Sequence, residues 1–128
     1  MIAVDTNIVV RFLMDDDVRQ SEQATHLFRR ETIFLAKSVL LETEWMLRRG
    51  YRIEPAKIAD ALEALIGLPN VTCEDDSSVR QALMWHQAGM DFADALHLAA
   101  SSRATQFITF DRDMIKTAKR LGLPVSEP

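Results

Sequence analysis

Apolar residues along this chain follow two alternating patterns, short continuous runs and longer segments with helical spacing. The continuous runs predict strands at residues 1–4, 33–36, 71–74 and 106–110, with a last short strand near Val125. Helical spacing predicts the helices between them, over residues 8–13, 21–30, 38–47, 55–66, 76–89, 91–100 and 111–120. Strands that alternate with helices predict an α/β fold, with a mostly parallel central sheet of four or five short strands flanked by helices.

Several residues mark where these helices should begin and end. Ser38 is expected to cap the helix at residues 38–47, and Gly50 should end it. Pro55 suits the first turn of the next helix because its missing N–H has no partner there anyway.

Composition limits the class of protein. A chain of 128 residues with 48% hydrophobic and 27% charged residues is expected to form a single globular domain over residues 1–128. The net charge of −4 gives no overall basic surface, so any nucleic-acid contact must be local. Cys73 is the only cysteine, which excludes an internal disulfide and a cysteine-based zinc site and predicts a buried free thiol. No basic leader and no apolar stretch of about 20 residues is present, which favours a cytoplasmic protein without membrane contact.

The first candidate functional residue is Asp5, which follows the apolar run of residues 1–4, predicted to be a buried strand. Ligands of open α/β sheets bind at the carboxyl ends of the strands, so a carboxylate there is well placed for a site. A structural role remains open, because an aspartate in this position can equally cap the helix that follows.

The two glutamates of the helix at residues 38–47 are expected to have different roles. Glu42 interrupts a mostly apolar stripe without a nearby basic residue, and burying a lone carboxylate is costly unless a metal ion or cation neutralises it. Glu44 has Arg48 four residues later, in the favourable order for an ion pair along a helix. Glu42 is therefore the functional candidate and Glu44 the structural one.

The C-terminal part of the chain supplies further acids at the ends of predicted elements. Asp91 and Asp94 lie at a helix start, where Asp91 can serve as cap and Asp94 as a first-turn acid. Asp111 follows the strand at residues 106–110 as Asp5 follows the first strand, and Asp113 is expected to cap the last helix. Carboxylates gathered at one sheet edge raise one another's pKa unless a cation is present, and Mg²⁺ or Mn²⁺ is the natural occupant of such an oxygen-lined site.

Four motifs in order resemble the PIN domain, and more narrowly the VapC toxins of toxin–antitoxin pairs. They are the triplet at residues 5–7 after a short strand, Leu41–Glu42 in a helix, the segment at residues 91–95, and the segment at residues 109–111. The resemblance extends from Met1 to about Leu121. No single motif is decisive, and the resemblance is specific because all four motifs occur in this order.

The resemblance implies a Mg²⁺-dependent ribonuclease with an acidic quartet, which by position is Asp5, Glu42, Asp94 and Asp111. By the same resemblance, Asp113 is a fifth candidate acid, and Asn7 and Thr109 are supporting polar residues. Family members typically form homodimers, cleave RNA that is often tRNA or rRNA, and are silenced by a VapB-type antitoxin whose C-terminal segment lies across the active-site groove.

Basic residues and histidines complete the set of candidates. Phosphates could be held by several basic side chains, or these could be solvated helix ends: Arg11, Arg48, Arg49, Arg52, Lys116, Lys119 and Arg120. His26, His86 and His97 have no metal-ligand spacing, so packed or surface positions are expected for them.

Two other functions remain as alternatives. A receiver-like signalling domain is also a small α/β fold with acids at its sheet edge, but it would require an acidic pair after the first strand, where Asp5 stands alone. A catalytically inactive PIN fold acting as a binding module is disfavoured because all four acids are present.

Overall fold

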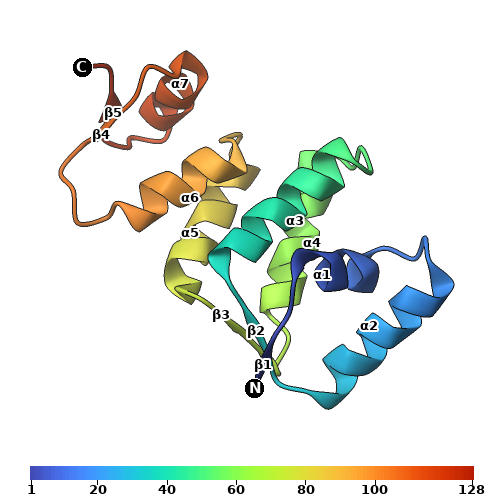
Figure 1. Ribbon diagram of the computed structural model, residues 1–128. Helices are drawn as coiled ribbons and strands as arrows, with labels where there is room; N and C mark the ends of the chain where they lie inside the picture. Colours follow the sequence, from blue (N-terminus) through green and yellow to red (C-terminus); the bar gives the residue numbers. More distant parts are fainter. The chain divides into compact units, whose positions relative to one another are not determined.

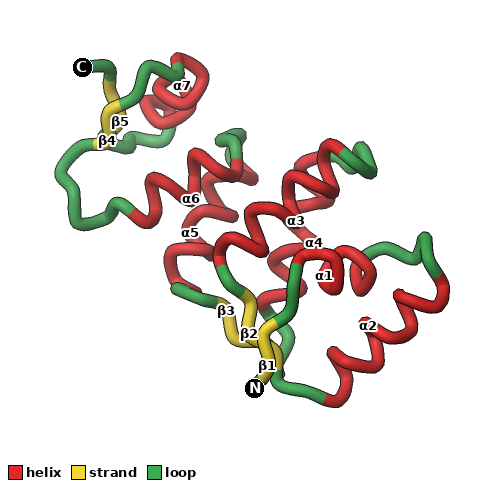
Figure 2. The backbone as a smooth tube through the Cα atoms, in the orientation of Figure 1, coloured by secondary structure: helices red, strands yellow, loops and turns green.

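The computed structural model describes residues 1–128 as an α/β protein of seven helices and five short strands (Figures 1 and 2). The chain divides into two compact units, Met1–Asp76 and Ser77–Pro128. Each unit combines helices with its own small parallel sheet.

The first unit is built on a three-stranded parallel sheet. Its strands, in spatial order, are β1 (Ile2–Ala3), β2 (Ile33–Leu35) and β3 (Val71–Cys73), which lie side by side in Figure 1. Because all three strands run in the same direction, their carboxyl ends meet at one edge of the sheet. Helices α1 (Thr6–Leu13) and α3 (Lys37–Arg49) both begin at that edge.

Helices α2 (Val18–Arg30) and α4 (Pro55–Ile66) complete the first unit. Helix α1 packs against α2 and α3, and α3 packs against α4. The apolar stripes predicted from the sequence form the core, which includes the fully buried side chains of Val9, Ile33, Leu40, Leu47, Ile58 and Leu62.

The second unit contains helices α5 (Asp76–Gln87), α6 (Phe92–Ala100) and α7 (Arg112–Arg120). Strands β4 (Phe107–Ile108) and β5 (Val125–Ser126) form a two-stranded parallel sheet, and α7 packs against β5. The turn between α5 and α6 uses Gly89 at φ 111°, a conformation that favours glycine because a side chain there would be strained.

The predicted α/β class with parallel strands and flanking helices is confirmed. The strands, however, pair as sheets of three and two instead of one central sheet, because β4 and β5 are hydrogen-bonded to each other. The first strand was expected to be buried, but Ala3 is exposed and only Val4, just beyond the strand, is buried.

The expected cap at Ser38 is wrong. Helix α3 begins one residue earlier, after Ala36, which makes no side-chain cap. The free N–H at this end is satisfied from elsewhere in the unit, since Glu74 Oε1, just beyond β3, accepts a hydrogen bond from the Lys37 amide at 2.9 Å. A helix terminus needs a partner for its first amides, but the partner need not be local in sequence.

Candidate metal centre

Asp5 lies directly beyond Val4, where the chain leaves β1, and caps α1. Its Oδ1 accepts a hydrogen bond from the Thr6 amide at 2.7 Å, so the capping role suggested by the sequence is confirmed. Capping occupies one carboxylate oxygen, and the exposed side chain keeps the other for a ligand.

Two neighbours of Asp5 in α1 also present polar groups. Asn7 is exposed and its side chain makes no hydrogen bond within the protein. Thr6 is 3% exposed, and its hydroxyl is buried without a hydrogen-bond partner. Such an unpaired buried hydroxyl is costly unless water or a ligand completes it. Sequence reasoning missed Thr6, although its position between Asp5 and Asn7 was the available signal.

The two glutamates of α3 have opposite environments. Glu44 is 1% exposed and forms an ion pair with Arg48, whose Nε lies 2.8 Å from Glu44 Oε2. The structural assignment of Glu44 is therefore confirmed. Glu42 is exposed and has no partner, so the reason given for it, burial in an apolar stripe, is wrong: helical rotation turns Glu44 inward and Glu42 outward. Glu42 remains a free carboxylate on a helix that starts at the same sheet edge as Asp5.

Two aspartates of the second unit cap its helices. Asp91 Oδ1 accepts from the Asp94 amide at 3.1 Å at the start of α6. Asp111 Oδ1 accepts from the Met114 amide at 3.0 Å at the start of α7, and the Asp111 amide donates to Thr109 Oγ1 at 3.0 Å. The expectation that Asp113 caps the last helix is wrong, since Asp111 fills that position and leaves Asp113 in the first turn.

These helix starts border one cavity of about 360 Å³ within the second unit. Its lining residues are Gly89, Met90, Asp91, Asp94, Asp111, Asp113, Met114 and Thr117. The structure thus brings together Asp94, Asp111 and Asp113, three of the acids selected from the sequence, and adds Asp91. The lining contains no lysine, arginine or histidine.

The environment of this cavity shifts the pKa of Asp94. Partial burial, followed by the negative charges of Asp91 and Asp111, raises the pKa of the Asp94 carboxyl above its ordinary value, while His97 acts weakly in the opposite direction. The Asp94 carboxylate accepts no hydrogen bond and forms no ion pair. A bound cation would relieve both the desolvation and the repulsion.

The donor chemistry fits a hard divalent cation, because every candidate ligand is a carboxylate oxygen. Taken alone, neither unit gathers three or more aspartate, glutamate, histidine or cysteine side chains closely enough to hold an ion.

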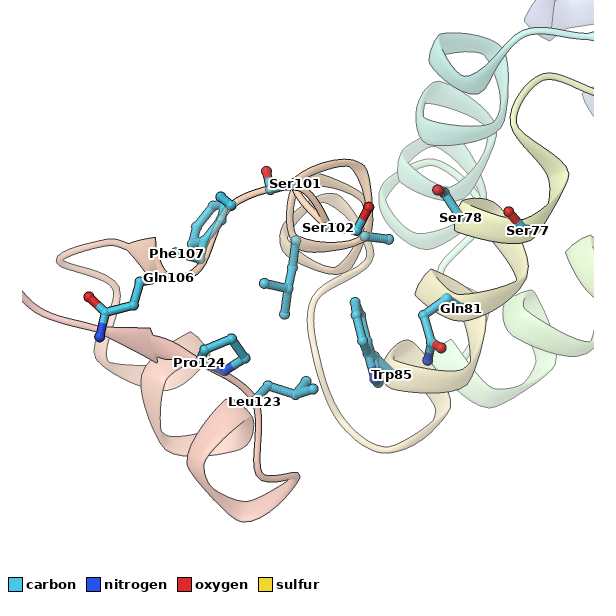
Figure 3. Close-up of a pocket in the computed structure, with 13 residues that line it drawn as sticks. Ser77, Ser78, Gln81, Trp85, Ser101, Ser102, Gln106, Phe107, Leu123 and Pro124 are labelled. Atoms are coloured by element: carbon cyan, nitrogen blue, oxygen red, sulfur yellow. The ribbon is translucent and has the colours of Figure 1, made fainter.

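Another cavity of the second unit, of about 420 Å³, has a different lining (Figure 3). Figure 3 shows Trp85 beside Gln81 and Leu123 beside Pro124, with serines at residues 77, 78, 101 and 102. No carboxylate lines it, so it is not a candidate metal site.

Among the basic residues, three of the phosphate candidates are already engaged. Arg11 pairs with Asp16 at 3.0 Å, Arg48 pairs with Glu44, and Arg120 donates to the Ala88 carbonyl. Four others are exposed and have no such partner: Arg49, Arg52, Lys116 and Lys119.

The histidines and the cysteine have the expected structural positions. His86 is buried, and its Nδ1 lies 2.7 Å from the Met90 carbonyl oxygen. His26 and His97 are exposed. Cys73 is buried and free, as predicted.

Comparison with known proteins identifies the family. The model of the PIN domain matches residues 2–120, which is nearly the whole chain and includes both units. The protein belongs to the PIN domain family. PIN domains are typically metal-dependent nucleases that bind RNA, and this class of activity agrees with the acidic residues described above. No curated protein sequence matches this chain. None of its helices has the length and apolar character needed to cross a membrane.

Proposed function

We propose that this PIN-domain protein is a Mg²⁺-dependent ribonuclease and the toxin of a toxin–antitoxin pair. The proposed metal ligands are Asp5, Glu42, Asp94 and Asp111, and Mn²⁺ is an acceptable substitute for Mg²⁺. Asp113 is a fifth candidate ligand.

The observation that carries this proposal is the acidic environment of the Asp94 carboxylate in a protein of the PIN family. Its carboxylate lines a cavity with three other aspartates, is partly desolvated, and forms no ion pair within the protein. An arrangement that disfavours its own ionised form is typical of a site that a cation completes.

The side chains around the acids have supporting roles. Thr109 fixes the start of α7 by accepting from the Asp111 amide, which holds the Asp111 carboxylate at the cavity. Asn7 presents a free amide beside Asp5 and can hydrogen-bond to a phosphate oxygen or a water molecule. Asp111 is favoured over Asp113 as the fourth ligand, because its Oδ1 bond to the Met114 amide fixes its orientation while leaving Oδ2 free.

Hydrolysis requires a polarised phosphodiester and an activated water molecule. When bound, Mg²⁺ supplies both, by acting as a Lewis acid and by lowering the pKa of water. The carboxylates hold and orient the ion, and the unpaired cations Arg49, Arg52, Lys116 and Lys119 are available for flanking phosphates.

The main test is cleavage of RNA, with tRNA and rRNA as first substrates, by the wild type and by Asp5→Asn and Asp94→Asn. Cleavage should require Mg²⁺ and fall sharply in both variants. Asp60→Asn is a matched control because Asp60 is exposed on α4 and lies outside the candidate site. Cleavage that persists in excess chelator, or equally in all variants, would exclude the mechanism.

The biological role has its own test. As a toxin, the protein acts in the cytoplasm, forms a homodimer, and is neutralised by a cognate VapB-type antitoxin. Expression should arrest growth, Asp94→Asn should relieve the arrest, and co-expression of the neighbouring antitoxin gene should do the same. Growth arrest that is identical for wild type and Asp94→Asn would separate toxicity from nuclease activity. An inactive PIN binding module would show neither Mg²⁺-dependent cleavage nor this difference.

A further inference from the structure

A second cavity, of about 670 Å³, lies in the first unit between helices α1 and α2. Its lining consists of one stripe from each helix: Asn7, Ile8, Arg11, Gln20, Gln23, Ala24 and Leu27. Asn7, Ile8 and Arg11 share one face of α1 by their spacing of one and four residues, and the other four residues repeat on one face of α2. We call this cavity the α1–α2 groove.

The lining of the α1–α2 groove is amide-rich and close to neutral. Three of its residues carry side-chain amides, Asn7, Gln20 and Gln23, and Ile8 and Leu27 supply apolar surface. Its single charged lining residue, Arg11, is compensated by the ion pair with Asp16. Asparagine, glutamine and arginine are the side chains that recognise base edges, and apolar or planar surface supports a base face.

Arg11 fixes the orientation of Gln20. Arg11 Nε lies 2.6 Å from the Gln20 oxygen, and further bonds to Asp16 and Tyr51 hold the guanidinium in place. Because arginine only donates, Gln20 must turn its carbonyl oxygen toward Arg11, which leaves its NH₂ group as a donor without a partner in the protein. Gln23 makes no hydrogen bond within the protein, so its whole amide is available.

The α1–α2 groove includes the start of α1, the helix that Asp5, one of the proposed metal ligands, caps. Asn7 lines the groove and lies two residues after Asp5 on the same helix start. In the proposed nuclease, an RNA strand bound at Asp5 would bring a nucleotide adjoining the cleaved bond close to the start of α1, where the groove begins.

We infer that the α1–α2 groove is a base-recognition pocket that takes one unpaired nucleotide of the RNA next to the cleaved bond. Gln20 and Gln23 are its specificity-determining residues, and Arg11 is a positioning residue that acts through Gln20. The inference rests on the proposed ribonuclease function. Bases in duplex RNA do not expose their edges to such a pocket, so the substrate is single-stranded or looped at this nucleotide.

The test measures binding without cleavage. Four fluorescent RNAs of sequence UUUUNUUUU, with N as each base in turn, are titrated with the full chain at low salt in chelator and followed by anisotropy. The wild type should prefer one base by roughly tenfold. Gln23→Leu, which keeps size and removes the amide, should lower this preference to less than about twofold. Gln106→Leu, an exposed glutamine in the second unit, should leave it unchanged.

Gln20→Glu gives an independent measurement. The glutamate keeps an acceptor for Arg11 but removes the NH₂ donor, so the preference among the four bases should change. The added charge should weaken all four complexes alike, and the ratio between them is therefore the readout. Thermal unfolding verifies that each variant folds, which is expected because Gln20 and Gln23 are exposed.

Two results would overturn the inference. One is equal affinity for the four RNAs, or no binding to any, by the wild type. The other is an unchanged preference in both Gln23→Leu and Gln20→Glu, which would leave the groove to another occupant such as a partner polypeptide. A protein that discriminates bases here but does not cleave RNA with Mg²⁺ would retain the pocket and refute the proposed nuclease instead.

Discussion

Replacing each of the two glutamates of α3 with glutamine should separate stability from activity. Glu44 is 1% exposed and its carboxylate bonds to Arg48 at 2.8 and 3.4 Å. Glu44→Gln keeps an acceptor for Arg48 but exchanges a charge-assisted hydrogen bond for a neutral one, which costs about 1–1.5 kcal/mol of unfolding free energy. Arg48 is 33% exposed in its side chain, so it can regain water, and the loss stays below the ~3–5 kcal/mol of a stranded buried charge.

Glu42→Gln is the matched change, since it alters the same chemical group two residues earlier on the same helix. Glu42 is exposed and unpaired, so the unfolding free energy should stay within about 0.5 kcal/mol of wild type. Glu42 is, however, a proposed metal ligand, so its replacement should lower the rate of RNA cleavage by at least about tenfold.

The assays are urea and thermal unfolding followed by circular dichroism, and initial rates of RNA cleavage in Mg²⁺. Glu44→Gln should lower the melting temperature by about 3–6 °C and retain cleavage at temperatures where it is folded. The reverse result, an inactive but stable Glu44→Gln together with an active Glu42→Gln, would refute the assignment of the two roles.

Three further predictions follow from the structure. The raised pKa of Asp94 means that, without metal, the folded state binds a proton more tightly than the unfolded state. The unfolding free energy should therefore fall as pH rises from the ordinary carboxyl value of 3.8 through the raised folded value. Urea unfolding across this pH range in chelator should show this decrease in the wild type and not in Asp94→Asn. Mg²⁺ at 100 times its dissociation constant should stabilise the wild type by about 2.7 kcal/mol in the same assay, and Asp94→Asn much less at equal concentration; equal stabilisation would contradict a ligand role for Asp94. Phe92→Ala removes a side chain that is 0% exposed and should lower the unfolding free energy by about 3–5 kcal/mol, whereas Phe110→Ala, at 81% exposure, should change it little.

Local sequence signals were sufficient for most of the fold. Pro55 and Gly67 bound α4 at the positions expected from the sequence, and the spacing of apolar residues placed every helix within a few residues. The pairing of Glu44 with Arg48 was also predicted, because residues four apart on a helix are neighbours whatever the rest of the chain does.

Contacts between residues far apart along the chain could not be predicted from the sequence. The cap of α3 comes from Glu74, far along the chain, in place of the adjacent Ser38. The choice between Asp111 and Asp113 as cap depended on where the chain leaves β4, which apolar periodicity does not specify.

The candidate acids show the same division. Their identity and order along the chain were available from sequence, and they led to the family that the comparison then established. The environment of each acid was decided by the tertiary structure: Glu42 is exposed, and Asp94 shares a cavity with Asp91 and Asp111.

The sequence by itself determined the helices, the parallel strands and the set of acidic residues, because these depend on side chains close together along the chain. Only the tertiary structure decided the partner of each polar group and the existence of the α1–α2 groove. Burial and charge repulsion depend on distance in space, and the packing of helices and strands sets that distance independently of separation along the chain.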